Sequence, residues 1–133
     1  MIDTNTNTVA ATIPVGRGPH SVTITPSGHH AYTADSDANP VSIIDIARRA
    51  VTKAISAGSY ADDIAITPDG SRAYTANLGS DTIFVIDTTT NAVIATTPVG
   101  HDPRGIAITP DGRQAFISNL SSNTVSVLDI TVA

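Results

Sequence analysis

The sequence contains no cysteine, no tryptophan and no glutamate. Without cysteine, neither a disulfide framework nor a thiolate metal site can form. No stretch approaches the roughly 18 consecutive apolar residues of a membrane span. The residues after Met1, Ile2–Thr4, also lack the basic and then apolar pattern of a signal peptide. We therefore expect neither membrane insertion nor a leader in this chain.

Basic residues are scarce as well. Seven Lys and Arg residues stand against 12 acidic residues, so the net charge is −5 and the isoelectric point is near 5.0. A nucleic-acid groove or an anionic membrane surface would require a basic stripe. The composition therefore argues against a nucleic-acid partner.

The remaining composition favours strands and turns. All 12 acidic residues are Asp, while Thr, Val, Ile, Ala, Gly and Pro are plentiful. Asp is a poorer helix former than Glu, β-branched residues favour strands, and Gly and Pro favour turns. The hydrophobic fraction of 41% lies at the low end for folded chains. The sequence therefore predicts a folded all-β protein.

A turn motif recurs at a fixed spacing. Thr-Pro-Ser-Gly at 25–28 is followed by Thr-Pro-Asp-Gly at 67–70 and at 109–112, so the period, 67 minus 25 and again 109 minus 67, is 42 residues. Further landmarks keep this register without a gap: Gly16/Gly58/Gly100, Val9/Val51/Val93, Ile24/Ile66/Ile108 and Ala31/Ala73/Ala115. Three full units run from Asp3 to Leu128.

Each unit contains four short apolar runs between polar turns, as at 63–66, 73–76, 82–86 and 92–96. These runs predict strands, and the Thr-Pro-x-Gly motif predicts a type I turn between the first two. Four strands repeated every 40 to 45 residues are typical of a β-propeller blade. The fold prediction is one repeat domain, 1–133, of three tandem four-stranded blades. Its units run at about 3–44, 45–86 and 87–128, with core aromatics at Tyr32, Tyr74 and Phe116.

The chain resembles the YVTN β-propeller repeat family over essentially its whole length. The resemblance rests on four segments, Tyr74–Asn77, Phe116–Asn119, Asn123–Asp129 and Ala11–Gly16. Asp35 replaces the Asn of this pattern in the first copy, and Ile55–Gly58 lacks its Pro. The resemblance implies surface-layer or secreted bacterial and archaeal proteins, commonly with seven blades, and hence an extracellular or cell-surface location. It implies no single activity.

Three blades do not close a ring. Propellers close with about 4 to 8 blades, so three would leave two apolar blade faces open. The chain opens with an expected outer strand at about Val9–Pro14 and ends with a third strand at about Val125–Asp129. We expect the outer strand to complete the last blade of a neighbouring subunit, which gives a homodimeric ring of six blades. The alternative is that this chain is part of a longer propeller.

The candidate site lies where the three copies differ most in their polar residues. This is the link from an outer strand to the next innermost strand, at 17–20, 59–62 and 101–104. In a propeller this link crosses one face from rim to axis, so its side chains should gather at the mouth of the central channel, where ligands commonly bind. A solvated, mutually neutralising rim is the alternative interpretation. The candidate ligand-binding residues are Arg17, His20, Tyr60, Asp62, Asp63, His101 and Arg104.

Catalytic and metal motifs are missing from the sequence. It has no Gly-x-Ser-x-Gly elbow, no phosphate-binding loop, no His-x-x-x-His and no acidic loop, so we predict no catalytic residue, metal or cofactor. The leading hypothesis is a non-enzymatic binding or scaffold module that acts through self-assembly and protein or glycan contacts. One alternative is a lactonase- or lyase-like enzyme with a polar or metal site at the channel mouth, because some seven-bladed relatives are such enzymes. Another is an engineered or partial fragment whose only activity is assembly.

Overall fold

The computed structural model describes residues 1–36, 41–55 and 60–130, and the strands in these ranges form four antiparallel sheets. No α-helix occurs among these residues, and the single helical turn is the 3-10 segment η1 (Leu120–Ser122). None of the described segments is a helix long and apolar enough to cross a membrane. The all-β prediction is confirmed.

Three sheets follow the 42-residue repeat, and we call them blades 1, 2 and 3. Blade 1 consists of β3 (Pro19–Ile24), β4 (His30–Asp35), β5 (Val41–Asp45) and β6 (Ala50–Ile55). Blade 2 consists of β7 (Ala61–Ile66), β8 (Arg72–Asn77), β9 (Thr82–Asp87) and β10 (Ala92–Pro98). Blade 3 has three strands, β11 (Pro103–Ile108), β12 (Gln114–Asn119) and β13 (Thr124–Asp129). Each strand pairs with the next along the chain, as in a propeller blade.

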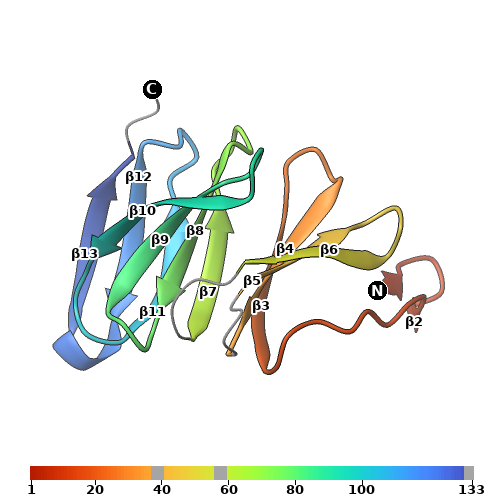
Figure 1. The fold of residues 1–133 in the computed structure, drawn as a ribbon, viewed down its shortest axis with the longest axis horizontal. Coiled ribbons are helices and arrows are strands. Elements are labelled where there is room, and N and C mark those ends of the chain that lie inside the picture. The colour runs from red at the N-terminus through yellow and green to blue at the C-terminus, as the bar shows by residue number, and fades with distance from the viewer. Residues whose placement is uncertain (37–40, 56–59, 131–133) are drawn as a thin grey trace.

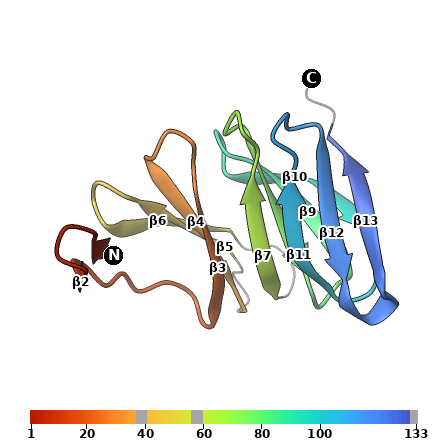
Figure 2. The same cartoon turned by 180° about the vertical axis from the view of Figure 1, so that it is seen from behind.

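The blades stand side by side, with the N-terminal segment at one end of the row and β13 at the other (Figure 1). The first strands of the blades are neighbours, because β3 contacts β7 and β7 contacts β11. The reverse view shows β7 and β11 next to each other (Figure 2). These innermost strands are the ones that line the axis of a propeller.

The core lies between the blades, and it repeats. Tyr32 and Ile43 of blade 1 pack on Ile64 of blade 2 in one cluster. The equivalent Tyr74 and Val85 of blade 2 pack on blade 3 in the second. Apolar burial of this kind stabilises each junction by roughly 25 cal/mol per Å². The junction of blades 1 and 2 and the junction of blades 2 and 3 therefore use equivalent side chains.

The predicted hairpin turns are confirmed in all three copies. Gly28, Gly70 and Gly112 have φ values of +76°, +76° and +73°. Their amides donate to the Thr carbonyl three residues earlier at 2.8 Å in each copy. A Cβ on Gly70 would lie 3.2 Å from Cδ of Pro26 in the neighbouring hairpin. Glycine is therefore favoured there both by its backbone conformation and by the close approach of the adjacent blade.

In the single chain, most of the expected outer strand at Val9–Pro14 does not form. Instead, β1 (Ile2–Asp3) and β2 (Thr8–Val9) form a short hairpin, and residues 10–18 belong to no strand. The pairing of Ile2 with Val9 repeats the Ile44–Val51 and Ile86–Val93 pairs of the other blades. The segment therefore has the hairpin tip of a blade, but the rest of its outer strand has no third strand to pair with.

Candidate functional site

The link that enters each innermost strand has a shared backbone geometry. Its second residue is left-handed, with φ of +59° at Gly18, +43° at Tyr60 and +53° at Asp102. The carbonyl of that residue accepts a hydrogen bond from the backbone amide of Ser36 (3.1 Å), Leu78 (2.9 Å) or Leu120 (2.9 Å) respectively. Each link is thus fixed to the end of its own blade's second strand. The scaffold displays different side chains from equivalent positions.

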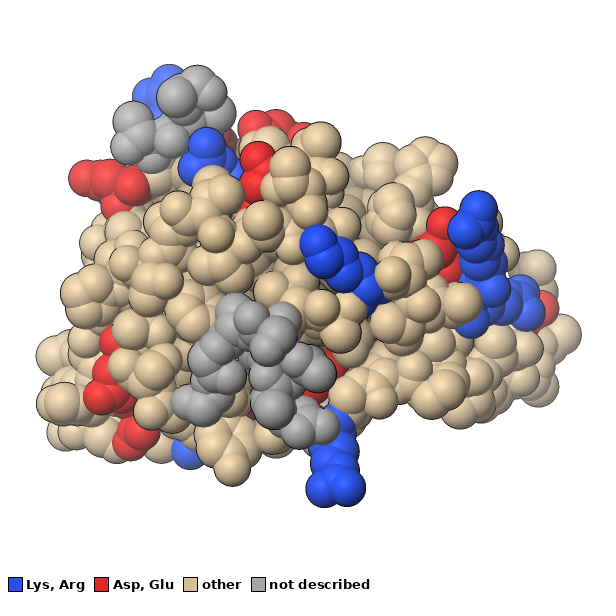
Figure 3. Space-filling view, in the orientation of Figure 1, with Lys and Arg blue, Asp and Glu red and all other residues tan. Residues whose placement is uncertain are grey.

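His20, Asp62 and Arg104 stand at the second position of β3, β7 and β11. Because these strands are neighbours, the three residues lie at one level of the inner wall. His20 and Arg104 are exposed and Asp62 is half-buried. No hydrogen bond or ion pair joins the three within the described ranges. On the face drawn in Figure 3, charged side chains lie in separate places, with one small group of basic side chains at the right-hand end next to acidic ones.

Asp63 has a different environment from its neighbour. One carboxylate oxygen accepts hydrogen bonds from the Ser21 hydroxyl of blade 1 at 2.6 Å and from the Ile64 amide at 2.9 Å. The other oxygen accepts the Ile106 amide of blade 3 at 3.0 Å. Ser21 and Gly105 stand at the equivalent positions in the other copies. Asp63 therefore joins the innermost strands of three blades, and this contact network accounts for the residue structurally.

His101 forms the one strong charged contact among the predicted site residues in the described part of the chain. Its Nδ1 lies 2.9 Å from Oδ2 of Asp81, in the loop between β8 and β9. The other oxygen of Asp81 accepts the Asp102 amide at 3.0 Å. The Ser122 hydroxyl accepts the His101 amide at 2.7 Å, and the Ser121 hydroxyl donates to Asp102. Loops of blades 2 and 3 thus form a polar cluster around one imidazole.

Asp81 and His101 each favour the charged form of the other. The amide of Asp102, and then the His101 ring, lower the pKa of Asp81. The hydrogen bond and the charge of Asp81 raise the pKa of His101. When Nδ1 donates to the carboxylate, the lone pair of the imidazole is on Nε2, which has no hydrogen-bond partner within the described ranges. A carboxylate that orients an imidazole in this way is the arrangement used for general-base catalysis.

Sequence reasoning found His101 but missed Asp81. The sequence did contain a signal for this pair, because both residues differ from those at the equivalent positions of the other copies. Asp81 stands where the other copies have Asn39 and Asn123, and His101 stands where they have Arg17 and Ser59. Both changes fall at the same blade junction. Asn39 and Ser59 lie outside the described residues, as does the predicted landmark Gly58.

Arg17 and Tyr60, the remaining candidates, are exposed side chains of their links. Neither side chain is hydrogen bonded within the ranges that the structure describes. Those ranges also contain no group of three or more His, Asp, Glu or Cys side chains placed to hold a metal ion.

Two four-stranded sheets and one three-stranded sheet, packed side by side with their first strands adjacent, define this chain as a β-propeller protein. A family model described as "Lactonase, 7-bladed beta-propeller" matches residues 48–133. That match covers more than half of the 133-residue chain, so the chain belongs to this lactonase family of seven-bladed propellers.

Solved structures agree with the fold. Hydrazine synthase of Kuenenia stuttgartiensis is 30% identical with a TM-score of 0.90, over 96% of this chain and 38% of that one. A functionally unknown protein of Desulfotomaculum acetoxidans is 22% identical with a TM-score of 0.78, over 96% and 46%. A putative 6-phosphogluconolactonase of Bacteroides fragilis is 22% identical with a TM-score of 0.76, over 86% and 35%. This chain therefore spans less than half of each. No curated protein matches it.

These comparisons correct two expectations. They support a β-propeller family but not the YVTN repeat family in particular. The leading hypothesis of a non-enzymatic scaffold is wrong, because the matching family is named for lactonases and one structural neighbour is a putative lactonase. The physical reason is that most of the sequence builds blades. Only a few loop residues carry chemistry, and they form no recognisable linear motif.

Proposed function

We propose that this chain carries part of a lactone-hydrolysing site on the loop face of its propeller. The observation that carries this proposal is the lactonase family match over residues 48–133. The Asp81–His101 pair lies within those residues, with His101 on the link that enters the innermost strand β11 and Asp81 in the loop between β8 and β9. It supplies the kind of base that hydrolysis of an ester-like bond requires.

The proposed reaction is general-base hydrolysis. Nε2 of His101 removes a proton from water while the water oxygen attacks the lactone carbonyl carbon. The tetrahedral intermediate then breaks its ring C–O bond, and the departing alkoxide takes the proton back from the imidazolium. One water is consumed, and a hydroxy acid is released. Asp81 keeps the imidazole in the required tautomer and stabilises its charged form.

Arg104 and His20 complete the proposal. Arg104 follows His101 by three residues at the start of β11, and its exposed guanidinium carries a fixed positive charge. A lactone carbonyl becomes negative in the intermediate and a carboxylate in the product. Arg104 is therefore the cation best placed along the chain to attract either, with His20 and Asp62 on the neighbouring strands as further contacts.

The test is a hydrolysis assay with a panel of γ- and δ-lactones, including sugar lactones, followed by acid release at constant pH. We expect hydrolysis above the uncatalysed rate that falls at least 100-fold in His101→Gln, a typical loss for a general base. His29→Gln, an exposed histidine at the other end of the strands, should retain full activity. Equal rates for His101→Gln and the unchanged chain would contradict the proposed role of His101. A rate no higher than background for every lactone would contradict the function.

We also propose that the two open blade faces close against each other between copies of this chain. The faces are complementary because each repeats one side of an internal junction. On blade 3, Phe116 and Val127 are 40% and 53% exposed, whereas their equivalents Tyr74 and Val85 are 3% and 6% exposed under blade 3. The prediction that Phe116 is a core residue is thus wrong in the isolated chain, where no blade follows it.

Blade 1 presents the opposite side of the same interface. Val22 is 64% exposed, whereas its equivalent Ile64 is 4% exposed against blade 1. Blade 3 of one copy can therefore cover blade 1 of the next by the contacts that already join blades within the chain. Two copies give six blades, and the first residues of one copy would complete the three-stranded blade 3 of its partner. The family description of seven blades favours further blades of the same type as the competing arrangement.

A further inference from the structure

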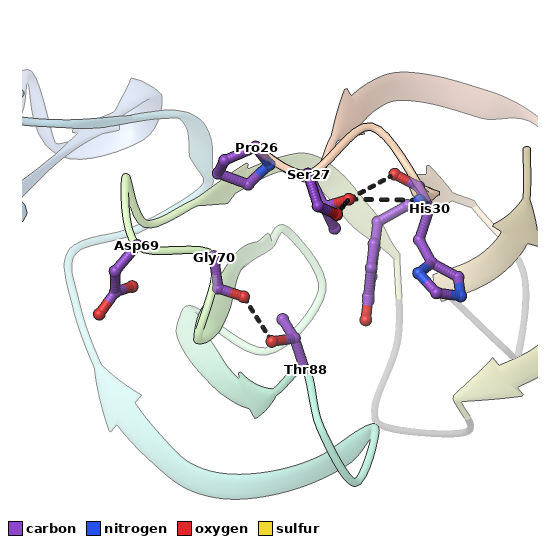
Figure 4. Close-up of a pocket in the computed structure, with 8 residues that line it drawn as sticks. Pro26, Ser27, His30, Asp69, Gly70 and Thr88 are labelled. Atoms are coloured by element: carbon purple, nitrogen blue, oxygen red, sulfur yellow. Dashed lines mark hydrogen bonds between the residues drawn. The ribbon is translucent and has the colours of Figure 1, made fainter.

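A polar cavity lies at the junction of blades 1 and 2. It is at the opposite end of the innermost strands from His101. It has a volume of about 200 Å³. Figure 4 shows residues from its two sides, with Pro26, Ser27 and His30 on blade 1 and Asp69, Gly70 and Thr88 on blade 2. The next junction has a related but smaller cavity of about 140 Å³ between the hairpins of blades 2 and 3. Asp69 borders both cavities, so the smaller cavity is a comparison for the residues that differ, His30, Ser27 and Thr88.

Three side chains that line the larger cavity are departures from the repeat, and one of them, Thr88, replaces an apolar residue, whereas Asp69 has its equivalent in Asp111. Thr88 stands where the other copies have Ile46 and Ile130. His30 stands where they have Arg72 and Gln114, and Ser27 where they have Asp69 and Asp111. None of these residue types is needed to build a blade, because the other blades fold without them. All three departures nevertheless border one cavity.

The polar groups of this cavity are suited to hydroxyl groups of a ligand. Oδ1 of Asp69 is bonded to the Thr67 hydroxyl at 2.6 Å and to the Ser71 amide at 3.0 Å. Within the described ranges its Oδ2 has no partner, so it remains an acceptor for a ligand donor. These bonds, with that of Thr67 first, lower the pKa of Asp69, which keeps the carboxylate negative at neutral pH. The half-buried His30 ring and the Ser27 hydroxyl, on the blade 1 side of the cavity, can each donate or accept a hydrogen bond.

We propose that the Asp69–His30 cavity binds a small neutral polyol, of the size and chemistry of a monosaccharide. Its volume is below the 300 to 1,000 Å³ range typical of pockets for drug-sized ligands, so the ligand is small. The Asp69 carboxylate accepts hydroxyl donors and repels anions. The cavity therefore selects a neutral sugar over a sugar acid, which separates it from the lactonase product. With few polar contacts and an open mouth, the dissociation constant is on the order of 1 mM.

The experiment is an NMR titration of the ¹⁵N-labelled chain with glucose, galactose, mannose and myo-inositol, each to 50 mM, and with gluconate as the anionic comparison. We expect saturable shifts of the Ser27, His30, Gly70 and Thr88 amides with at least one neutral polyol. The equivalent amides of the smaller cavity, such as Gly112, should not shift. Gluconate should bind at least 5-fold more weakly.

Two variants exchange cavity residues for those that blade 3 uses at the same positions. His30→Gln removes the imidazole and Thr88→Ile fills the cavity with an apolar side chain. Each should weaken binding at least 5-fold while leaving the amide spectrum of blade 3 unchanged. The proposal is overturned if no probe gives saturable shifts, if gluconate binds as tightly as the neutral sugars, or if both variants bind like the unchanged chain. The lactone assay does not depend on this cavity, so the two results are independent.

Discussion

Asp35 is a fully buried carboxylate, and we predict that replacing it with Asn will stabilise the protein. Its Oδ2 accepts the Ser42 hydroxyl at 2.7 Å, but its Oδ1 is buried and has no hydrogen-bond partner among the residues that the structure describes. The nearby Thr33 hydroxyl oxygen is also buried and has no partner in the described part of the chain. An unsatisfied buried polar atom costs about 1–3 kcal/mol, and a charged one costs more. Blade 1 therefore carries a local cost that blade 2 avoids, because the amide oxygen of Asn77 is bonded there, whereas Oδ1 of Asn119 in blade 3 is also buried without a partner among the described residues.

Each of the other blades shows one of the two contacts that Asn could make at this position. In blade 3, the amide of Asn119 donates to the Ser126 hydroxyl at 2.8 Å, and Ser126 is the equivalent of Ser42. In blade 2, the Thr75 hydroxyl donates to the amide oxygen of Asn77 at 2.9 Å, and Thr75 is the equivalent of Thr33. Asp35→Asn makes both contacts available in blade 1, because the amide has one donor group and one acceptor oxygen.

The expected gain in the free energy of unfolding is about 1–3 kcal/mol. At this chain length each kcal/mol corresponds to roughly 3–5 °C in melting temperature. Urea unfolding followed by circular dichroism at pH 7 measures the gain. The reverse change, Asn77→Asp, is the matched control and should destabilise blade 2 by a similar amount. An Asp35→Asn variant that is less stable than the unchanged chain would refute the reasoning and would mean that the carboxylate has a favourable partner.

Two further predictions concern the candidate site. Asp63→Ala should lower the free energy of unfolding by about 1–3 kcal/mol, because the half-buried Ile106 amide loses its acceptor. The control Asp62→Ala should change it by less than about 0.5 kcal/mol. Equal effects of the two variants in urea unfolding would contradict the inter-blade role of Asp63. Asp81→Asn should lower the pKa of His101 in an NMR titration, because the carboxylate raises it. The lactonase rate, which requires the neutral imidazole, should then begin to rise at lower pH, and an unchanged His101 pKa would argue against the pair.

The Asp81–His101 contact also has a defined pH window. The pKa of Asp81 is lowered from 3.8, so its contribution to stability is present above that value and is lost as the pH falls through the folded-state pKa. The pKa of His101 is raised from 6.5, so its contribution is complete below 6.5 and is lost as the pH rises through the folded-state pKa. Both side chains are exposed, so the contact orients the imidazole more than it stabilises the fold.

Much of the fold was predictable because each blade uses the same local devices. The Thr-Pro-x-Gly turns gave the period, and the alternation around Ala73–Ala76 placed a strand with Tyr74 in the core. The exceptions occur where a blade lacks its neighbour. Phe116 is a core residue only when another blade covers it, and residues 10–14 form an outer strand only beside a third strand.

The site was less predictable because it is built from contacts between loops. His101 was found from the variation among the links, but its partner Asp81 lies 20 residues earlier, in the preceding blade. Asp63 was selected as a ligand residue, yet its carboxylate is occupied by Ser21 and Ile106. Such pairings depend on which strands become neighbours. Residue type and spacing in the sequence do not specify them.

The central question is what covers the two open blade faces. Light scattering on a size-exclusion column measures the mass of the 133-residue chain in solution. We predict twice the chain mass of 13.6 kDa, and a return to 13.6 kDa in Phe116→Asp, which places a charge on the face of blade 3. A monomeric unchanged chain would contradict closure between copies and would leave the faces for further blades of a longer propeller.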